Sequence, residues 1–342
     1  MLSSDKQFSV LKNENVLLTG GCGFIGSEIT KQLSQAGARI TIIDNLSSGK
    51  KYHIKGLRGV TLLEGDLSDT NLVKKAVKNQ EYIINLAALP FIPDSYHYPM
   101  EFFEVNVNAT INLALAAIKE KKVKRFVHIS SSEVYGSSRY TPMDENHPTT
   151  PHSTYAVSKL AGERVVYTLH KEHDLPAVII RPFNSFGPNI TQPYIIPEII
   201  GQMLKGKKEI TLGNVHSKRD LTFVSDTARG IILPLVTDGV IGETINIGSE
   251  RAVIIKDLVK IVSKIMSKDV QIKIDASRFR PYDVDTLICD SGRANRLLGW
   301  NPEVNITDGL KMTIKWMMSN KVQLTSFKGW NSYYRKDDDA RT

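Results

Sequence analysis

Six short runs of apolar residues alternate with helix-length segments through the first half of the chain. The runs lack a polar alternation, as expected for strands buried on both faces of a parallel sheet. Segments of this length connect parallel strands by right-handed crossovers. The pattern therefore predicts a doubly wound parallel α/β sheet with strands near residues 15–19, 39–43, 60–64, 82–86, 125–129 and 177–181. Helices between them are expected at Ser27–Ala36, Met100–Lys121 and Ser153–His173.

The alternation becomes irregular after Pro188. We assign residues 1–188 to the sheet domain and residues 189–342 mainly to a smaller C-terminal α/β lobe that binds substrate, with segments near 220–248 returning to the first domain. No flexible linker separates the two halves, so we expect a cleft between them. Other expected features are a strand at Asp220–Val224, helices near Pro197–Lys205, Ile255–Met266 and Ile306–Met318, Trp300 and Trp316 in the core of the lobe, and frayed ends at Met1–Asn13 and Tyr334–Thr342.

Composition argues against several classes of protein. The chain has neither an apolar run of about 18 residues nor a signal-peptide pattern, so we expect no membrane span and a cytoplasmic location. Only Cys22 and Cys289 occur, without the spacing of a disulfide framework or a metal site. The net charge of +8 favours an anionic partner. Because the lysines are scattered rather than clustered in a basic stripe, nucleic acid is not the expected partner.

The segment VLLTGGCGFIGSEI joins the first expected strand to the first helix. Gly21, Gly23 and Gly26 have the spacing G-x-G-x-x-G, and Gly20 precedes them. Glycine permits a tight turn and lets the backbone approach a pyrophosphate, whose charge then lies at the unpaired N–H groups of the helix start. In this strand–turn–helix context the motif predicts a Rossmann-type dinucleotide site that also includes Phe24 and Ile25.

Asp44 stands at the end of the second expected strand. A carboxylate there can accept both hydroxyls of an adenosine ribose, and it would repel a 2′-phosphate, so the sequence favours NAD over NADP. Ser47, Ser48, Lys50 and Lys51 just beyond could still hold a phosphate. Further residues that follow expected strands are assigned to the same cofactor site: Asn45, Ser48, Gly49, Asp66, Leu67, Leu86, Ala87 and Ala88.

Tyr155 and Lys159 are spaced i and i+4 on one expected helix, after a strand that ends in Ser130-Ser131-Ser132-Glu133. Lowering the pKa of a phenol from about 10 to about 7 takes roughly 4 kcal/mol. An ammonium about 5 Å away supplies roughly 3 kcal/mol at an effective dielectric constant of about 20. An oxidised nicotinamide could supply the rest, so Tyr155 is a candidate base. A second copy, Tyr167 with Lys171, faces another side of the helix and is interpreted as surface packing.

Several motifs together resemble one known family. TGGCGFIG, Asp44, GDLSD, SSSEVYG, Tyr155-x-x-x-Lys159 and RPFNSFGP are similar to those of extended short-chain dehydrogenases/reductases of the nucleotide-sugar epimerase/dehydratase group, and the resemblance covers nearly the whole chain. It implies an NAD-retaining enzyme for a nucleoside-diphosphate sugar, and a homodimer. Tyr155 would deprotonate the C4 hydroxyl, Lys159 would hold the nicotinamide ribose, and Ser131 would bond a sugar oxygen. Asn184, Arg219 and Arg280 would hold the nucleotide diphosphate.

Glu133 distinguishes among reactions within this group. Once C4 is a ketone, a carboxylate beside C5 can remove the C5 proton and help to expel the C6 hydroxyl. The chain resembles 4,6-dehydratases in placing Glu before VYG, and its IPDSY and GNVHSKRDLTFVSDTARG stretches resemble dehydratases of nucleotide-linked N-acetylglucosamine. It departs from dTDP-glucose dehydratases in having Ser132 where they have a proton-donating Asp. A 4-epimerase, a UDP-glucuronate-type decarboxylase, a dehydrogenase that releases NADH and a non-catalytic NAD-binding sensor or scaffold remain alternatives.

Overall fold

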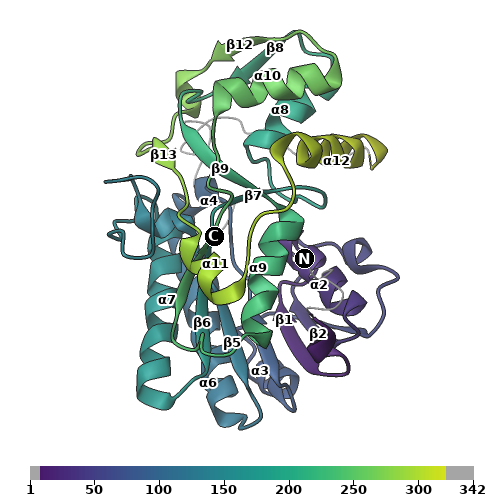
Figure 1. The fold of residues 1–342 in the computed structure, drawn as a ribbon, viewed down its shortest axis with the longest axis vertical. Coiled ribbons are helices and arrows are strands. Elements are labelled where there is room, and N and C mark those ends of the chain that lie inside the picture. Colours follow the sequence, from purple (N-terminus) through teal and green to yellow (C-terminus); the bar gives the residue numbers. More distant parts are fainter. Residues whose placement is uncertain (1–7, 321–342) are drawn as a thin grey trace, which may run out of the picture.

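The computed structural model describes residues 8–320, and it contains a seven-stranded, all-parallel sheet (Figure 1). The strand order is β10-β6-β5-β4-β1-β2-β3, so the direction of winding reverses between β1 and β4. This confirms the predicted Rossmann-type α/β fold. The strands are β1 (Asn15–Thr19), β2 (Arg39–Asp44), β3 (Val60–Glu64), β4 (Tyr82–Asn85), β5 (Arg125–Ile129), β6 (Ala177–Pro182) and β10 (Thr244–Ile247).

Helices cover both faces of this sheet because the central strands are apolar on both faces. Val16 and Leu18 pack into a core under α2 and α9, whereas Leu17 between them packs into a core under α3, α6 and α7. These helices are α2 (Phe24–Gln35), α9 (Val224–Val236), α3 (Thr70–Val77), α6 (Ala109–Lys119) and α7 (Thr154–His173). Three layers result, with α6 and α7 side by side on one face (Figure 1).

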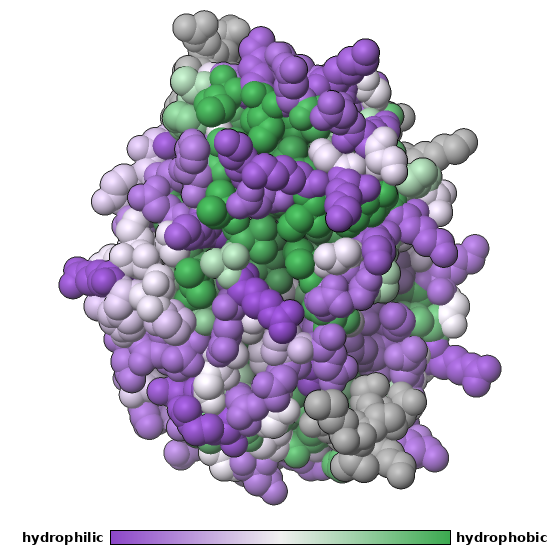
Figure 2. All heavy atoms as spheres, turned by 45° about the horizontal axis from the view of Figure 1, so that its top comes forward, coloured by the Kyte–Doolittle hydropathy of each residue, from purple (hydrophilic) through white to green (hydrophobic). Residues whose placement is uncertain are grey.

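The C-terminal lobe has its own apolar core and two small sheets. One sheet has the order β11-β9-β13 with β7 paired to β9, and the other pairs β12 with β8. Its elements are β7 (Asn184–Phe186), α8 (Ile195–Leu204), β8 (Glu209–Leu212), β9 (Lys218–Phe223), β11 (Ala252–Ile254), α10 (Ile255–Met266), β12 (Gln271–Ile274), β13 (Thr286–Leu287) and α12 (Ile306–Ser319). Figure 2, with the top of Figure 1 turned forward, shows hydrophobic side chains gathered on this end of the molecule.

Short segments complete the described chain and connect the main elements. They are η1 (Ser9–Leu11), η2 (Lys51–Ile54), α4 (Ile92–Ser95), α5 (Pro99–Phe103), the π-helical turn η3 (Glu104–Asn108), η4 (Ser132–Tyr135), η5 (Ala276–Arg278) and α11 (Gly292–Leu298). No helix within residues 8–320 is long and apolar enough to span a bilayer.

Three expectations about the fold are wrong. The N-terminal tail was expected to fray up to Asn13, but Phe8 and Leu11 are buried in the core beside α2, where their apolar area is removed from water. The segment Met100–Lys121 is not one α-helix, because the π-helical turn η3 separates α5 from α6. The expected tail at 334–342 lies outside the described residues.

Trp300 is the third correction. It is fully buried in the core under α2 and α9, where its indole N–H donates to the carbonyl of Asp226 at 2.9 Å. Trp316 does pack against the core of the C-terminal lobe. The strand expected at Asp220–Val224 is β9, and α9 begins directly after it at Val224, so a helix absent from the expectations belongs to the main sheet.

Candidate active site

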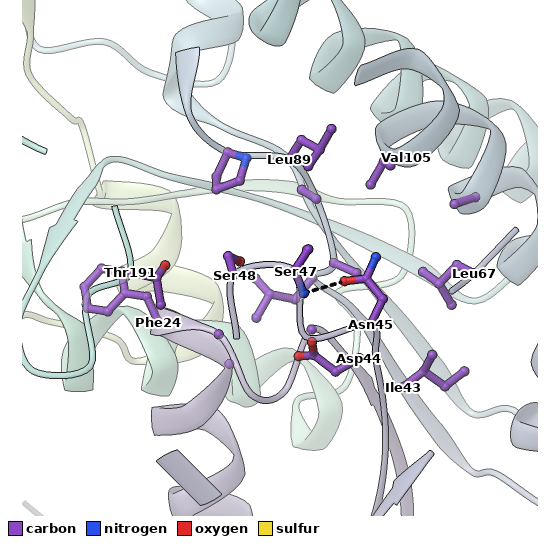
Figure 3. Close-up of a pocket in the computed structure, with 18 of the residues that line it drawn as sticks. Phe24, Ile43, Asp44, Asn45, Ser47, Ser48, Leu67, Leu89, Val105 and Thr191 are labelled. Atoms are coloured by element: carbon purple, nitrogen blue, oxygen red, sulfur yellow. Dashed lines mark hydrogen bonds between the residues drawn. The ribbon is translucent and has the colours of Figure 1, made fainter. Parts of the chain in front are cut away.

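A solvent-open cavity with a volume of about 170 Å³ lies at the carboxyl ends of β1, β2 and β4, where the winding direction reverses. Ligands of doubly wound sheets bind at this switch point. Figure 3 shows Asp44, at the end of β2, and Asn45, Ser47 and Ser48, from the loop after it, in the middle of the cavity, with Thr191 and Leu67 on opposite sides. The cavity brings together most of the residues assigned to the cofactor: Gly20, Gly23, Phe24, Ile25, Gly26, Asp44, Asn45, Ser48, Asp66, Leu67, Leu86, Ala87 and Ala88.

The glycine turn after β1 is built around close backbone contacts. A Cβ atom on Gly26 would lie 2.0 Å from the carbonyl oxygen of Gly20, so any side chain there would displace the turn. Gly20 has φ +71° and lies against Ala87 in the loop after β4. The N-cap of α2 is Gly23, which offers no side chain to the first N–H groups of the helix. These features suit a pyrophosphate at the start of α2.

Asp44 reaches the cavity with its carboxylate already fixed by the backbone. One oxygen accepts the N–H of Cys22 at 2.9 Å and the other accepts the N–H of Leu46 at 2.8 Å. Each carboxylate oxygen keeps a second lone pair for a ligand hydroxyl. Gly49 lies outside the lining, and a Cβ there would be 3.1 Å from Asp44 and 2.9 Å from Cys22. Gly49 thus allows the loop to close over Asp44.

Asp66 and Asn45 form a polar pair in the lining of the cavity. The Asn45 amide donates to the Asp66 carboxylate at 2.8 Å, and the Ser68 N–H donates to the same carboxylate at 2.8 Å. Partial burial raises the pKa of Asp66, but these hydrogen bonds outweigh it and hold the pKa below its usual value. The ionised carboxylate of Asp66 can accept a hydrogen bond from a ligand, and the side chain of Asn45 can donate or accept one. Together with the glycine turn and Asp44, this pair fits a dinucleotide with free ribose hydroxyls.

Tyr155 lies on the first turn of α7 and is hydrogen-bonded to Ser131. Burial raises the pKa of Tyr155 to about 12, the bond with Ser131 lowers it, and the charge of Glu133 raises it. Ser131 caps the short turn η4, since its hydroxyl accepts the N–H of Glu133 at 3.2 Å. Ser132, the next residue, is buried. The end of β5 thus presents Ser131 and Glu133 to the phenol.

Lys159 lies one turn further along α7 and is buried. Its ammonium donates to the carbonyl oxygen of Ile129, the last residue of β5, at 2.5 Å. Burial lowers the pKa of Lys159 to about 8, and the charge of Glu163 acts in the opposite direction. The second copy of the motif lies elsewhere, because Tyr167 packs on the core under α3 and α6 and its ring contacts Arg164, 4.3 Å from the ring centroid.

A second group of charges surrounds Glu133 on the side of the C-terminal lobe. Arg280 lies 3.7 Å from the Glu133 carboxylate and 3.8 Å from Asp283, and Arg219 lies 3.5 Å from Asp283. Burial and the neighbouring charge of Arg280 lower the pKa of Arg219. Asn184 on β7 has a buried amide oxygen without a partner within residues 8–320. Two guanidiniums with incomplete neutralisation favour an anionic ligand.

Residues absent from the sequence analysis complete the site. Asn106 in the π-helical turn accepts the N–H of Leu89 at 2.9 Å and donates to Ser158 of α7 at 2.9 Å, so it ties the cavity wall to the helix that carries Tyr155. An asparagine placed between two valines, Val105 and Val107, in an expected helix is the signal that could have identified it. The hydroxyl of Thr19 accepts the N–H groups of both Leu86 and Ala87 at 3.0 Å.

Tyr194 brings the C-terminal half of the chain into the cavity wall. Its hydroxyl lies 3.5 Å from the carbonyl oxygen of Pro90, and its ring lies edge-on to Phe91. Burial raises the pKa of Tyr194, and the neighbouring charges of Tyr155 and Asp94 act in the same direction. The cavity wall is thereby continuous with the surroundings of Tyr155.

Comparisons with known proteins agree with this geometry. The chain matches the GDP-mannose 4,6 dehydratase family model over residues 17–313. It is 31% identical to the solved UDP-N-acetylglucosamine 4-epimerase of Methanobrevibacter ruminantium, with TM-score 0.83 and coverage of 90% of this chain and 99% of that one. It is 29% identical to the dTDP-glucose 4,6-dehydratase of Streptomyces venezuelae solved with NAD bound, with TM-score 0.82 and coverage of 90% and 98%.

A third relative catalyses a different reaction. The UDP-N-acetyl-alpha-D-glucosaminuronate decarboxylase of Bacillus cytotoxicus is 30% identical, with coverage of 88% of this chain and 96% of the relative. Relatives with similar sequence identity to this chain are thus named for three different reactions, so sequence identity does not indicate which reaction this chain catalyses. Since the family model spans most of the sequence, the chain belongs to the GDP-mannose 4,6-dehydratase family, within the NAD-dependent nucleotide-sugar dehydratases, epimerases and decarboxylases.

Proposed function

We propose that this protein is an NAD-dependent 4,6-dehydratase of a nucleoside-diphosphate hexose, with nucleotide-linked N-acetylglucosamine as the favoured substrate. The observation that carries the proposal is the position of Glu133, a buried carboxylate between Tyr155 and Arg280. Simple epimerisation at C4 needs no carboxylate at C5, whereas elimination of the C6 hydroxyl does.

The cofactor site would be formed by the glycine turn, Asp44 and the Asn45–Asp66 pair. A bound NAD would supply the hydride chemistry at C4, oxidation followed by return of the hydride, with no net oxidation. Asp44 would accept the adenosine ribose hydroxyls with its remaining lone pairs. The preference for NAD over NADP follows, because a 2′-phosphate would stand against this carboxylate.

Tyr155 would take the proton of the C4 hydroxyl. Its pKa of about 12 in the structure means that the phenol needs additional positive charge nearby before it can act as a base near neutral pH. Lys159, on the same side of α7, would supply part of it, together with the bond from Ser131. Ser131 would also orient the sugar oxygen.

Glu133 would remove the C5 proton once C4 is a ketone. Its backbone is fixed at the start of the turn η4, where its N–H donates to the Ser131 hydroxyl, and its carboxylate lies 3.7 Å from Arg280. Arg219, Arg280 and Asn184 would hold the nucleotide diphosphate, because the two guanidiniums are only partly neutralised by Asp283 and Glu133. The sugar would then extend from the diphosphate toward Tyr155.

The mass of the product tests the reaction class. The purified protein is incubated with UDP-, GDP-, dTDP- and CDP-linked glucose and N-acetylglucosamine and with UDP-glucuronate. Loss of one water is expected from one of the hexoses, and Tyr155→Phe should convert none. Loss of carbon dioxide would establish a decarboxylase, and an altered sugar of unchanged mass an epimerase. Free NADH accumulating in excess NAD would establish a dehydrogenase, and no conversion would favour a binding protein.

We also propose a homodimer. Met100, Leu115 and Val157 are exposed apolar residues on α5, α6 and α7, and burial of such side chains against a second copy would be favourable. Light scattering after size exclusion should give twice the chain mass, and Leu115→Glu with Val157→Glu should give a monomer. Met312→Glu, an equally exposed methionine on α12, serves as the matched control. A monomer in the unaltered protein would contradict the proposal.

A further inference from the structure

The proposed dehydration moves more protons than one carboxyl group can carry. Glu133 collects the C5 proton, after which one proton must reach the departing C6 hydroxyl and another must return to C5. If Glu133 keeps its proton for C5, a second acid is required. Ser131, Ser132 and Arg280 are unsuitable, because hydroxyl and guanidinium groups release no proton near neutral pH.

His152 comes directly before Ser153, the N-cap of α7, and three residues before Tyr155. It packs against the end of the turn that carries Glu133. The N–H of Gly136 donates to the carbonyl oxygen of Glu133 at 3.1 Å, and a Cβ atom on Gly136 would lie only 2.8 Å from Nε2 of His152. Any residue other than glycine at 136 would therefore displace the imidazole.

The imidazole also contacts the C-terminal lobe. The ring of Tyr282 lies 4.0 Å from that of His152 between centroids, and Tyr282 belongs to the same segment as Arg280. Nδ1 of His152 lies 3.5 Å from the hydroxyl oxygen of Ser137. The imidazole thus bridges the turn with Glu133 and the segment with Arg280.

Resting on the proposed dehydration, we propose that His152 is the second acid of this site, whose imidazolium protonates the departing C6 hydroxyl while Glu133 holds the C5 proton. The C5–H bond breaks to Glu133, the C5–C6 double bond forms, and the C6–O bond breaks as the oxygen leaves in water with the His152 proton. C6 then receives the hydride that C4 gave up, and C5 receives the proton of Glu133. Solvent reprotonates His152 and takes up the proton that Tyr155 gained.

The charged and titratable groups facing His152 set its titration. Burial lowers the pKa of His152 from 6.5, while the carboxylate of Glu133 raises it, and Tyr282 and Ser137 are neutral contacts. Since an acid must be protonated, kcat should fall as the pH rises through this pKa. In the His152→Gln variant, the residual kcat should no longer fall as the pH rises through this range.

The test uses the nucleotide sugar that the unaltered enzyme dehydrates, in deuterated water. His152→Gln should lose product by about 100-fold or more with KM nearly unchanged, while the recovered substrate gains deuterium at C5 because Glu133 still exchanges that proton. Glu133→Gln should yield neither product nor deuterium. His173→Gln, at the exposed C-terminal end of α7, is the matched control and should behave as the unaltered enzyme.

The outcomes separate this proposal from the one on which it rests. Dehydration by His152→Gln within about threefold of the unaltered rate, or equal loss of product and of C5 exchange in a folded variant, would overturn the role of His152 alone. An unaltered enzyme that removes water from no sugar in the panel would overturn the dehydratase assignment and with it this step. Thermal unfolding of each variant establishes that it is folded.

Discussion

The ammonium of Lys159 donates a hydrogen bond to the carbonyl oxygen of Ile129 at 2.5 Å, so the cation on α7 is anchored to the end of β5. The end of β5 also leads into Ser131 and Glu133. One contact therefore joins the helix that carries Tyr155 to the strand that carries its partners. The cost of this arrangement is a lysine buried with little compensating charge.

This burial predicts a trade between stability and activity. Burial lowers the pKa of Lys159 from 10.5 to about 8, which corresponds to roughly 3 kcal/mol of destabilisation below pH 8. Lys159→Met removes this cost but loses the bond to Ile129, worth about 1 kcal/mol. We expect a net gain of about 2 kcal/mol in unfolding free energy at pH 7, measured by urea denaturation, with loss of turnover.

The pH dependence of the unfolding free energy tests whether the buried charge of Lys159 is the cause of this gain. Between pH 8 and 10.5 the folded protein releases the Lys159 proton while the unfolded chain keeps it, so the stability of the unaltered protein rises with pH. The advantage of Lys159→Met should shrink over this window. If the gain in unfolding free energy of Lys159→Met stays constant with pH, its cause is packing rather than the buried charge.

Asp44 predicts the choice of cofactor. Asp44→Ala should weaken NAD binding by roughly 1 to 3 kcal/mol through the loss of charge-assisted bonds to the ribose. It should also narrow the preference for NAD over NADP. Isothermal titration with both cofactors measures this, and tighter binding of NADP than NAD to the unaltered protein would contradict it. Asp69→Ala, an exposed aspartate that caps α3, is a matched control that should change neither affinity.

The two YxxxK copies on α7 provide an internal control for the base. Tyr155→Phe should abolish turnover and leave nucleotide affinity nearly unchanged, because only the phenolic oxygen is removed. Tyr167→Phe should change the rate little, since Tyr167 packs against Arg164 on a different side of the helix. Steady-state rates and nucleotide titrations of both variants test this prediction. Equal losses of turnover in the two folded variants would mean that Tyr155 is not correctly assigned as the base.

Sequence periodicity predicted the fold where local pattern and burial coincide. The strands at residues 15–19 and 125–129 and the helix Ile255–Met266 lie where the apolar pattern placed them. α9 was missed because it begins at the residue after β9, without the turn signals that usually separate elements. Trp300 was misplaced because nothing in its local sequence indicates the long-range bond to Asp226.

For the site, motif residues close together in sequence were easier to identify than contacts between distant segments. The glycine turn and Asp44 line one cavity, as their spacing suggested. The contact of His152 with Tyr282 joins positions far apart in the chain, as does the bond between Asn106 and Ser158. Such contacts are set by how the two lobes and helices pack, which a period of 2 or 3.6 residues does not encode.

Arg280 and Arg219 predict different consequences for the same substitution. The side chain of Arg280 is 29% exposed and bonds no backbone carbonyl in the described structure, whereas the buried Arg219 also donates to the carbonyls of Lys218 and Asp285. Arg280→Gln should therefore raise KM for the nucleotide sugar by about 10- to 100-fold, the range for one charge-assisted phosphate contact, with little change in thermal unfolding.

Arg219→Gln should raise KM and also lower the melting temperature, because two backbone carbonyls lose their partner. Arg278→Gln offers a comparison on the same segment as Arg280, since Arg278 pairs with Glu198 at 2.9 Å at the edge of the lobe core rather than with Glu133. It should affect stability more than KM. If Arg280→Gln leaves KM for the nucleotide sugar unchanged while Arg278→Gln raises it, the diphosphate lies on the other side of this segment, and the path of the sugar toward Tyr155 must be redrawn.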